Sequence, residues 1–222
     1  MTEPGQLFGG EPPRASTAPG LFLCFEGGDG AGKSTQVLLL TEALEERGRD
    51  VVVTRQPGGT PLGAQIRELV LHGGHVSPRA EALLFAADKA HHVDELIRPA
   101  LAEARVVITD RYTDSSIAYQ GAGRDLGADE IRQLQHWAVG GLFPDLTVVL
   151  DVSPEVGRAR RGEVHDRLES EGDAFHAAVR QGFLDLAARD PERYLVIDAG
   201  LPPRDIHEQV LDAVQALLGA RA

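Results

Sequence analysis

The chain has 222 residues, a formal net charge of −12 and a single cysteine. Its length fits one α/β domain with a sizeable core. The acidic balance argues against a nucleic-acid-binding protein, because a surface that follows a phosphate backbone must be basic. A single cysteine, Cys24, permits no internal disulfide and gives no sign of an oxidising compartment. Any anionic ligand must therefore be held by local basic clusters.

The first 20 residues differ in composition from the rest of the chain. They contain four Pro and four Gly without hydrophobic periodicity, and such a segment cannot bury enough apolar surface to order itself. We expect a flexible tail over 1–20, followed by a single domain over 21–222. The tail lacks the basic and apolar regions of a secretory signal, and no apolar run approaches the length of a membrane span. These features predict a cytoplasmic protein without a membrane partner.

The apolar run 21–25 leads into a glycine-rich turn and then into a helical pattern. Gly27, Gly32, Lys33 and Ser34 match the phosphate-loop motif G-x-x-x-x-G-K-[ST] in the strand, turn and helix context that it requires. The glycines let backbone N–H groups point at phosphate oxygens, and the following helix adds its first-turn N–H groups. Lys33 supplies a cation for the terminal phosphates, and Ser34 a hydroxyl for Mg²⁺. An ordinary glycine turn before a helix is the alternative.

Four further apolar runs of strand length follow, at 50–54, 106–109, 146–151 and 194–198, and helical patterns separate them. In the first such pattern, Val37, Leu40 and Leu44 recur at helical spacing, and Gly48 follows as a stop signal. Most of the runs lack a polar face, which predicts a five-stranded parallel sheet with helices on both faces. Ligands of such a sheet bind at the carboxyl ends of the strands.

Polar residues follow the first three strand runs at 27–34, at 55–60 and at Asp110-Arg111. An aspartate directly after an apolar strand is where phosphate-loop enzymes hold Mg²⁺, so Asp110 joins Ser34 as a candidate metal residue. Helix capping is the alternative for Asp110. The chain contains no Asn, which excludes the Asn-Lys-x-Asp guanine motif of GTPase switches. It has only two lysines, Lys33 and Lys89, and so Lys89 also becomes a candidate functional residue.

Several segments, in this order, resemble the successive signatures of bacterial thymidylate kinases. They are 25–35 with the phosphate loop, 54–63 (TRQPGGTPLG), 84–89 (LFAADK) and 110–121 (DRYTDSSIAYQG). Residues 158–162 and 166–169 resemble the arginine-rich lid of that family, which we place at about 156–170. The resemblance covers about 21–215. It implies a P-loop NTPase fold, transfer of the γ-phosphoryl of ATP to dTMP in dTTP synthesis, a requirement for Mg²⁺, and a homodimer.

The resemblance also implies roles for individual residues. The ATP phosphates would lie on Gly27, Gly28, Asp29, Gly30, Ala31, Gly32, Lys33 and Ser34. The phosphate of dTMP would lie on Arg67 and Arg111, because a planar guanidinium suits a phosphate dianion. The nucleoside would be bound by Phe85 stacked on the thymine, by Lys89, Ser116 and Gln120 at its edge, and by Tyr119 against the sugar. Asp29 would approach the acceptor's sugar or the metal shell. Without the family, Arg67 is more simply interpreted as a solvated helix charge and Phe85 as a core residue.

Three positions depart from the family pattern. Gln56 stands where a Glu commonly follows the Arg, Lys89 stands where an Arg usually reaches the base, and Phe183 replaces a Tyr. Lysine can still donate to a carbonyl oxygen, but it lacks the planar fork of arginine. These departures leave phosphoryl transfer unaffected and weaken the expectation of strict thymine selectivity.

The source of the transition-state arginine is a separate question. Some thymidylate kinases carry it inside the phosphate loop, at the position that Gly30 occupies here. We therefore expect the lid to supply it through Arg161, together with Arg158, which shares one helix face with Arg161. A solvated helix face paired with nearby acidic residues is the alternative. The catalytic residues expected from the resemblance are Lys33, Asp29, Arg111, Arg158 and Arg161.

Two other functions remain open. The first is a kinase for another deoxynucleotide or a deoxynucleoside, and the second is a P-loop ATPase switch that controls a partner. The missing guanine motif and the arginine-rich lid argue against a switch. Arg67 and Arg111 favour an acceptor that already carries a phosphate.

Overall fold

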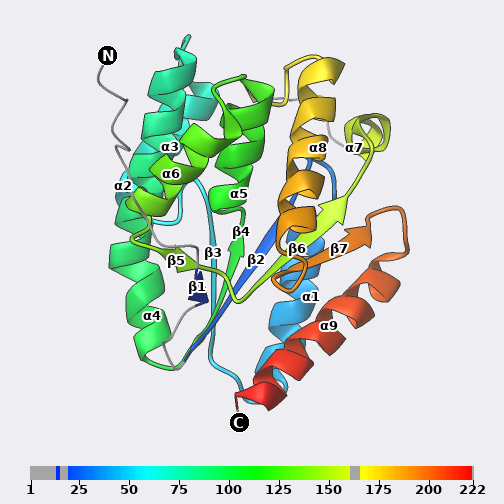
Figure 1. The fold of residues 1–222 in the computed structure, drawn as a ribbon. Coiled ribbons are helices and arrows are strands. Elements are labelled where there is room, and N and C mark those ends of the chain that lie inside the picture. The colour runs from blue at the N-terminus through cyan, green and yellow to red at the C-terminus, as the bar shows by residue number, and fades with distance from the viewer. Residues whose placement is uncertain (1–13, 16–19, 161–165, 222) are drawn as a thin grey trace.

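The computed structural model describes residues 14–15, 20–160 and 166–221. A wholly parallel five-stranded sheet runs through the molecule in the order β3-β4-β2-β6-β7 (Figure 1). Its strands are β2 (Leu21–Gly27), β3 (Val51–Arg55), β4 (Val106–Asp110), β6 (Leu146–Asp151) and β7 (Tyr194–Asp198). The predicted α/β fold is confirmed, and each strand lies within two residues of its predicted range.

The central strand β2 lies between β4 and β6, and the register pairs Leu23 with Ile108 on one side and with Leu146 on the other. All seven residues of β2 are buried. This burial explains its continuous apolar run, since a strand covered on both faces needs no polar alternation. The chain builds β3 and β4 on one side of β2 before it crosses to β6 and β7. The order reverses at β2, which is where open parallel sheets form a ligand crevice.

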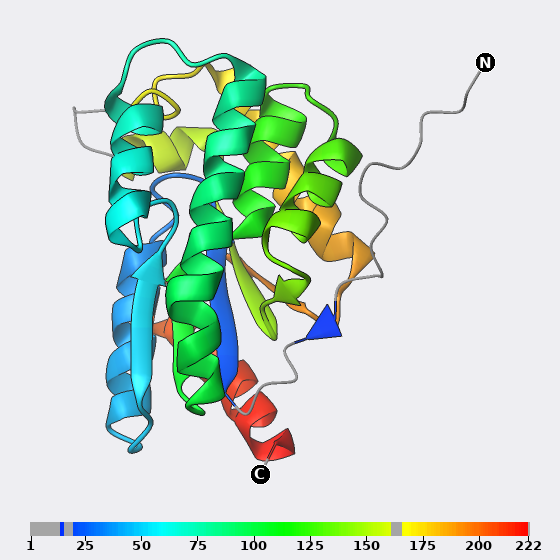
Figure 2. The same cartoon turned by 90° about the vertical axis from the view of Figure 1, so that its left-hand side faces the viewer.

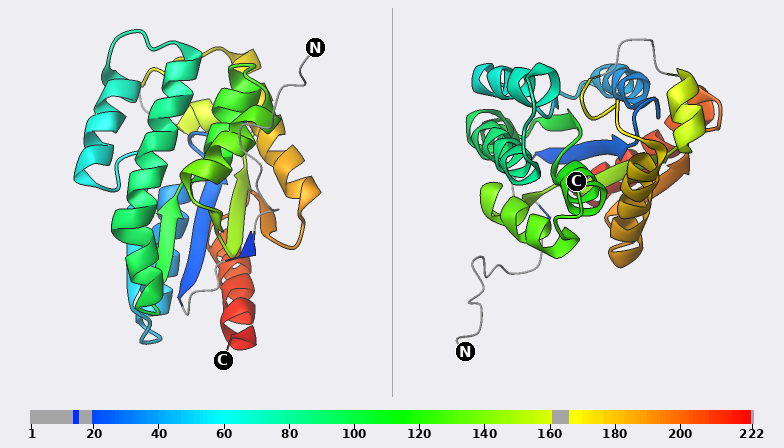
Figure 3. Two further views of the ribbon diagram at one scale, coloured as in Figure 1. Left: turned by 60° about the vertical axis from the view of Figure 1, so that its left-hand side comes forward. Right: turned by 90° about the horizontal axis from the view of Figure 1, so that it is seen from above.

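Helices cover both faces of the sheet (Figure 3). Helices α1 (Lys33–Glu45) and α9 (Pro203–Ala220) share one core cluster with Leu23 and Phe25 of β2. Phe22 and Cys24 point to the opposite face, which α4 (Arg98–Ala102) covers together with the preceding helical segments. There α3 (Pro78–His92), the π-helical segment η2 (Val93–Ile97) and α4 continue into one another as one long helix (Figure 2).

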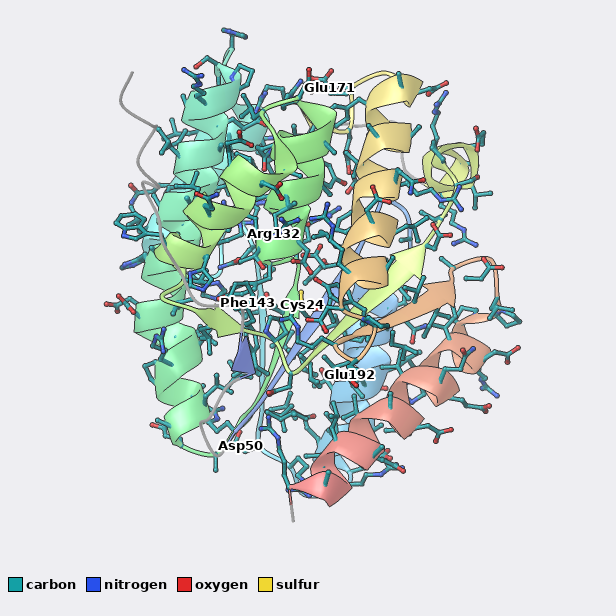
Figure 4. The ribbon with its side chains drawn as sticks, viewed as in Figure 1. Cys24, Asp50, Arg132, Phe143, Glu171 and Glu192 are labelled. Carbon is teal, nitrogen blue, oxygen red and sulfur yellow. The ribbon has the colours of Figure 1, made fainter. Side chains whose placement is uncertain are left out.

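The remaining elements complete the second layer and the rim. They are α2 (Pro61–Arg67), the π-helical η1 (Glu68–His72), α5 (Thr113–Ser116), the π-helical η3 (Ile117–Gly123), α6 (Ala128–Ala138), α7 (Pro154–Arg160) and α8 (Asp173–Arg189). Cys24 lies deep between the layers (Figure 4), and its burial raises the pKa of the thiol. Asp50, just before β3, and Glu171, just before α8, lie at opposite ends of the molecule (Figure 4). The carboxyl ends of the strands face the end marked by Glu171 (Figures 1 and 4).

A second, two-stranded sheet pairs β1 (Arg14–Ala15) with β5 (Leu142–Phe143) in parallel. The sequence analysis did not predict it, because two-residue strands carry no periodicity of their own. Arg14 and Ala15 lie inside the segment predicted as a flexible tail, and most of that segment lies outside the described residues. Among the helices that the structure describes, none is both long and apolar enough to cross a membrane.

Candidate active site

The carboxyl ends of β2, β3 and β4 open into a cleft of about 740 Å³. The cleft brings together most of the residues that the sequence analysis selected. Those that line it are Asp29, Gly30, Ala31, Gly32, Lys33, Ser34, Arg67, Phe85, Lys89, Asp110, Arg111, Ser116, Tyr119 and Gln120. Gly27 and Gly28 contribute backbone carbonyls beside it. The residues selected for the ATP phosphates and for the acceptor thus face one another across one space.

The phosphate loop has the backbone geometry that its glycines allow. Gly27 has φ +129°, and a Cβ there would collide with the carbonyl oxygen of Leu150, so only glycine fits. Helix α1 begins at Lys33, which aims its free N–H groups at the loop. Lys33 Nζ donates to the carbonyl oxygens of Gly27 at 3.1 Å and Gly28 at 3.0 Å. Burial and the charge of Arg111 lower the pKa of Lys33.

Ser34 and Asp110 form a pair suited to a divalent cation. Ser34 Oγ donates to Asp110 Oδ2 at 3.5 Å, and Asp110 Oδ1 is buried and accepts no hydrogen bond from the described residues. A hydroxyl and a carboxylate oxygen are ligands that Mg²⁺ accepts, with water completing its shell. No group of three or more His, Cys, Asp or Glu within the described residues could hold a metal. A cation here would therefore keep several waters, as Mg²⁺ does.

Asp29, Arg111 and Tyr119 form a hydrogen-bonded triangle at the middle of the cleft. Arg111 Nη2 donates to Asp29 and to the Tyr119 hydroxyl, and that hydroxyl donates to Asp29 Oδ2 at 2.8 Å. Burial alone would raise the pKa of Asp29, but the cations of Arg111 and Lys33 outweigh it and hold that pKa well below its usual range. The Asp29 carboxylate is therefore ionised and fixed in place.

Arg67 and Gln56 come from the loop and helix that follow β3. Helix α2 begins after Thr60, whose Oγ1 accepts from the Gly63 N–H at 3.0 Å, and Pro61 occupies its first turn. This start places Arg67 in the last turn of α2, where its Nη1 donates to the Pro57 carbonyl at 3.1 Å. Arg67 faces the cleft, so the structure does not support its interpretation as a simple solvated charge.

Buried groups of α3 support the same loop. The His92 ring is bonded through Nδ1 to Gln56 Nε2 and through Nε2 to Thr54 Oγ1, both at 2.7 Å. Burial, with a smaller contribution from Lys89, lowers the pKa of His92 to about 4. His92 is therefore neutral at pH 7. Asp88 Oδ1 accepts from the Gly58 N–H at 3.3 Å. A Glu at position 56 would place a carboxylate beside this neutral imidazole. Gln56 instead forms an uncharged hydrogen bond with His92 Nδ1.

Helix α3 contributes Lys89 and Phe85, on successive turns, to the wall of the cleft. Lys89 Nζ donates to Ser116 Oγ at 2.8 Å and to the Phe85 carbonyl at 3.4 Å, and lies 5.5 Å from the Phe85 ring. Burial lowers the pKa of Lys89 to about 8, against an opposing effect of Asp88. Gln120 Nε2 donates to Glu81 at 2.8 Å. Phe85 is 6% exposed and borders both core and cleft, so it combines the two interpretations given to it.

The arginines of the lid region take different positions. Arg158 pairs with Asp173 and is not among the residues of the cleft wall, whereas Arg160 lines the cleft and donates to the Ala199 carbonyl at 2.9 Å. Arg161 lies outside the described residues, so its predicted role stays a prediction. Gly30 has φ +79°, and a Cβ on it would collide with the carbonyl oxygen of Gly157 in α7. The close approach of α7 therefore leaves no room for a side chain at position 30.

One end of the cleft was not predicted from the sequence. Its wall there is formed by Gln36, Arg160, Ala199, Leu201, Pro203 and Ile206. Gln36 Nε2 donates to the Pro203 carbonyl at 2.8 Å and joins α1 to the start of α9. The signal was available, because residues 199–202 follow the carboxyl end of β7 and ligands bind at such ends. Arg55, directly after the predicted second strand, also lines the cleft and was not selected.

A parallel sheet with a phosphate loop after its central strand, opposite a second arginine-bearing wall, defines a P-loop nucleotide kinase. The family model described as thymidylate kinase matches residues 25–210. The chain belongs to the thymidylate kinase family, and it is an ATP-dependent nucleoside monophosphate kinase.

Individual relatives agree with this assignment. The chain is 56% identical over 207 residues to a thymidylate kinase of Clavibacter sepedonicus, a match that covers 91% of this chain and 98% of the relative. It is 51% identical over 198 residues to one from Synechococcus sp. (strain JA-3-3Ab), covering 89% and 97%. A crystal structure of thymidylate kinase from Ehrlichia chaffeensis superposes with a TM-score of 0.74 at 34% identity, covering 88% of this chain and 98% of that one.

Proposed function

We propose that this chain transfers the γ-phosphoryl group of ATP to dTMP and releases dTDP and ADP. The observation that carries the proposal is the pairing of two phosphate-directed walls in one cleft. Lys33 and the start of α1 form one wall, and Arg67 at the end of α2 lies on the other. Arg111 lies in the middle of the cleft, where its Nη1 shares the Gly27 carbonyl with Lys33 Nζ. A nucleotide acceptor needs both walls, whereas an ATPase switch needs only the first. Nothing in the comparisons favours a switch or a deoxynucleoside kinase.

In this proposal the phosphates of ATP lie on residues 27–34, and Ser34 with Asp110 holds Mg²⁺. When bound, the ion neutralises charge on the β- and γ-phosphates. The spare Oδ1 of Asp110 supports this assignment. Lys33 would follow the moving phosphoryl group, because its ammonium donates to the loop carbonyls of Gly27 and Gly28 and interacts electrostatically with Arg111 and Asp29. The missed wall at 199–206 would then receive the adenosine end of ATP, beside Arg160.

The proposed acceptor binds with its phosphate on Arg67 and Arg111 and its thymine near Phe85. Lys89, Ser116 and Gln120 face the base edge, and Lys89 already donates to Ser116. Tyr119 is 5% exposed, and its hydroxyl is hydrogen-bonded to Asp29 and Arg111. A fixed ring at this place would disfavour a ribose 2′-hydroxyl.

The transferring phosphoryl spreads negative charge over its equatorial oxygens, and a cation placed there is worth about 10³ to 10⁵ in turnover in related P-loop enzymes. Lys33 and Arg111 supply part of the positive charge that balances these oxygens. We propose that the lid supplies the rest through Arg161 and Arg158 when it closes, which requires Arg158 to leave Asp173. That pair is largely exposed, with side-chain exposures of 52% and 72%, and exposed ion pairs stabilise little. The free-energy cost of separating this pair is therefore small.

We further propose a cytoplasmic homodimer. Support comes from large apolar side chains on the contacting segments α2, η1 and α3, where Leu62, Leu69 and Leu83 are 43%, 56% and 58% exposed. Exposed apolar side chains that form a contiguous patch mark sites of protein–protein interaction. Sedimentation of the purified chain tests this, and a monomer at micromolar concentration would contradict it.

An ADP-release assay with dTMP, dUMP, UMP, CMP and thymidine tests the proposed reaction. We expect dTMP to give the highest kcat/KM and thymidine the lowest, because thymidine leaves two arginines without a phosphate. Comparable turnover of thymidine would instead indicate a deoxynucleoside kinase. Rapid ATP hydrolysis without any acceptor would indicate a switch.

A further inference from the structure

Arg111 has an unusual backbone at the end of β4. Its φ is +70°, in the left-handed region that non-glycine residues rarely adopt, and the next residue, Tyr112, has φ −153° and ψ −138°. Such a conformation persists only where surrounding contacts enforce it. The groups that hold this turn therefore decide where the Arg111 guanidinium lies.

The turn is held by Glu26, a residue of β2 with 0% exposure. Its Oε1 accepts from the backbone N–H of Tyr112 at 2.8 Å and of Ser115 at 3.0 Å, and its Oε2 accepts from Ser115 Oγ at 2.6 Å. Three donors from the residues just after Arg111 thus converge on one buried carboxylate. Glu26 itself is not part of the cleft wall that the structure describes.

Ser115 connects this carboxylate to the arginine. Its hydroxyl proton is directed to Glu26, which leaves the oxygen lone pairs for Arg111 Nη1 at 3.0 Å. The residues on either side of Glu26 act on Arg111 as well. The Gly27 carbonyl accepts from Arg111 Nη1 at 3.1 Å, and the Phe25 carbonyl accepts from the Arg111 backbone N–H at 2.9 Å. Residues 25–27 therefore fix both ends of Arg111.

We propose that Glu26 is a positioning residue that holds Arg111 toward the acceptor phosphate without touching either substrate. The inference rests on the proposed function, since that function assigns the acceptor phosphate to Arg111. It also explains why an acid is buried here. A carboxylate accepts from all three of these neighbours, whereas an amide would donate to the Ser115 oxygen that also accepts from Arg111.

Glu26→Gln keeps the shape of the side chain but replaces one of the two accepting carboxylate oxygens with a donating NH₂ group. The amide oxygen can still accept from Tyr112 and Ser115 N–H, but the amide nitrogen now donates to Ser115 Oγ. The Ser115 proton then loses its acceptor, and the amide N–H competes with Arg111 Nη1 for the lone pairs of Ser115 Oγ. We expect the KM for dTMP to rise about tenfold, the effect of losing one hydrogen bond to a charged group. The KM for ATP should change by less than about twofold.

Asp114→Asn is the matched control. Asp114, on α5, is a second buried carboxylate, but its Oδ2 accepts from the Tyr194 hydroxyl at 2.7 Å and its Oδ1 from the Thr113 hydroxyl at 3.3 Å. Burial and the charge of Asp114 raise the pKa of Glu26, so Asp114→Asn favours the ionised Glu26 that the proposal requires. We expect this variant to lower Tm and to leave the KM for dTMP within about twofold of wild type. If Glu26 were merely structural, Glu26→Gln would behave like this control.

A double-mutant cycle with Arg111→Ala completes the test. If Glu26 acts through Arg111, Glu26→Gln should add less than about twofold to the KM for dTMP of Arg111→Ala. Independent, additive effects would overturn the inference, as would an unchanged KM in Glu26→Gln alone. Should Glu26→Gln fail to fold, Ser115→Ala replaces it in the same cycle with the same criteria. An unchanged KM in Arg111→Ala would contradict the proposed function itself, which separates the two failures.

Discussion

Lys89 allows recognition of the acceptor base to be tested by pH as well as by mutation. Its ammonium is buried, donates to Ser116 Oγ and to the Phe85 carbonyl, and has a pKa lowered to about 8. Below that pH it carries three N–H donors, two of which these oxygens accept and one of which faces the cleft. Above it one donor is lost, and the amine no longer has a hydrogen for each acceptor.

The loss of a hydrogen bond from a buried charged donor costs about 1.5 to 3 kcal/mol. We therefore expect the KM for dTMP to rise about 10- to 30-fold as the pH increases from 7 to 9.5, with the rise beginning near the pKa of Lys89. Lys89→Arg should give a flat profile, because arginine stays charged throughout this range. Lys89→Met preserves length without any donor, and its KM should be raised equally at every pH.

The assay is ADP release at saturating ATP, with dTMP varied at each pH, for the wild type and both variants. Circular dichroism at each pH confirms that the proteins remain folded. A wild-type profile that stays flat to pH 9.5 would refute the reasoning. An equal pH dependence in Lys89→Arg would also refute it, because the titrating group would then lie elsewhere.

Three further predictions concern other parts of the site. Lys33→Ala should reduce transfer by several orders of magnitude with an unchanged circular dichroism spectrum, and turnover close to wild type would remove the loop lysine from the mechanism. His92, neutral with a pKa of about 4, should make the chain less stable as the pH falls from 6.5 to 4, by about 3 kcal/mol, because only the unfolded state gains a proton there. Urea unfolding at both pH values measures this, and an equal loss in His92→Leu would disprove it. Arg161→Ala should lower kcat far more than it raises either KM in steady-state kinetics, whereas kcat within a few-fold of wild type, alone and with Arg158→Ala, would reject the lid assignment.

The sheet could be predicted because the burial of its strands is visible in their amino-acid sequences. β2, β4 and β6 are buried on both faces, so each is a continuous apolar run, and the parallel order follows from the helices between them. The phosphate loop could also be predicted, since its glycines and Lys33 act through local backbone geometry. Such features depend on residues that are close in sequence.

Other features depend on partners distant in sequence. Glu26 is an acid within an apolar strand, and its partners lie 86 to 89 residues away, so no spacing pattern reveals them. Arg158 and Arg160 are two positions apart on α7, yet of the two only Arg160 lines the cleft. The rotation of α7 about its own axis decides this, and it is set by the packing of Gly157 against Gly30. The resemblance to thymidylate kinases identified Arg67, whose place in the cleft the residue pattern alone would not have indicated.

The central claim is that phosphate moves from ATP on the loop to a nucleotide held by Arg67 and Arg111. Incubation with ATP labelled at the γ-phosphate, in the presence of dTMP, tests it most directly when the products are separated. We expect the label in dTDP for the wild type, and a large loss of labelled dTDP for the variant carrying both Arg67→Ala and Arg111→Ala. Label released mainly as inorganic phosphate by the wild type, or an undiminished yield of dTDP from the double variant, would contradict the account.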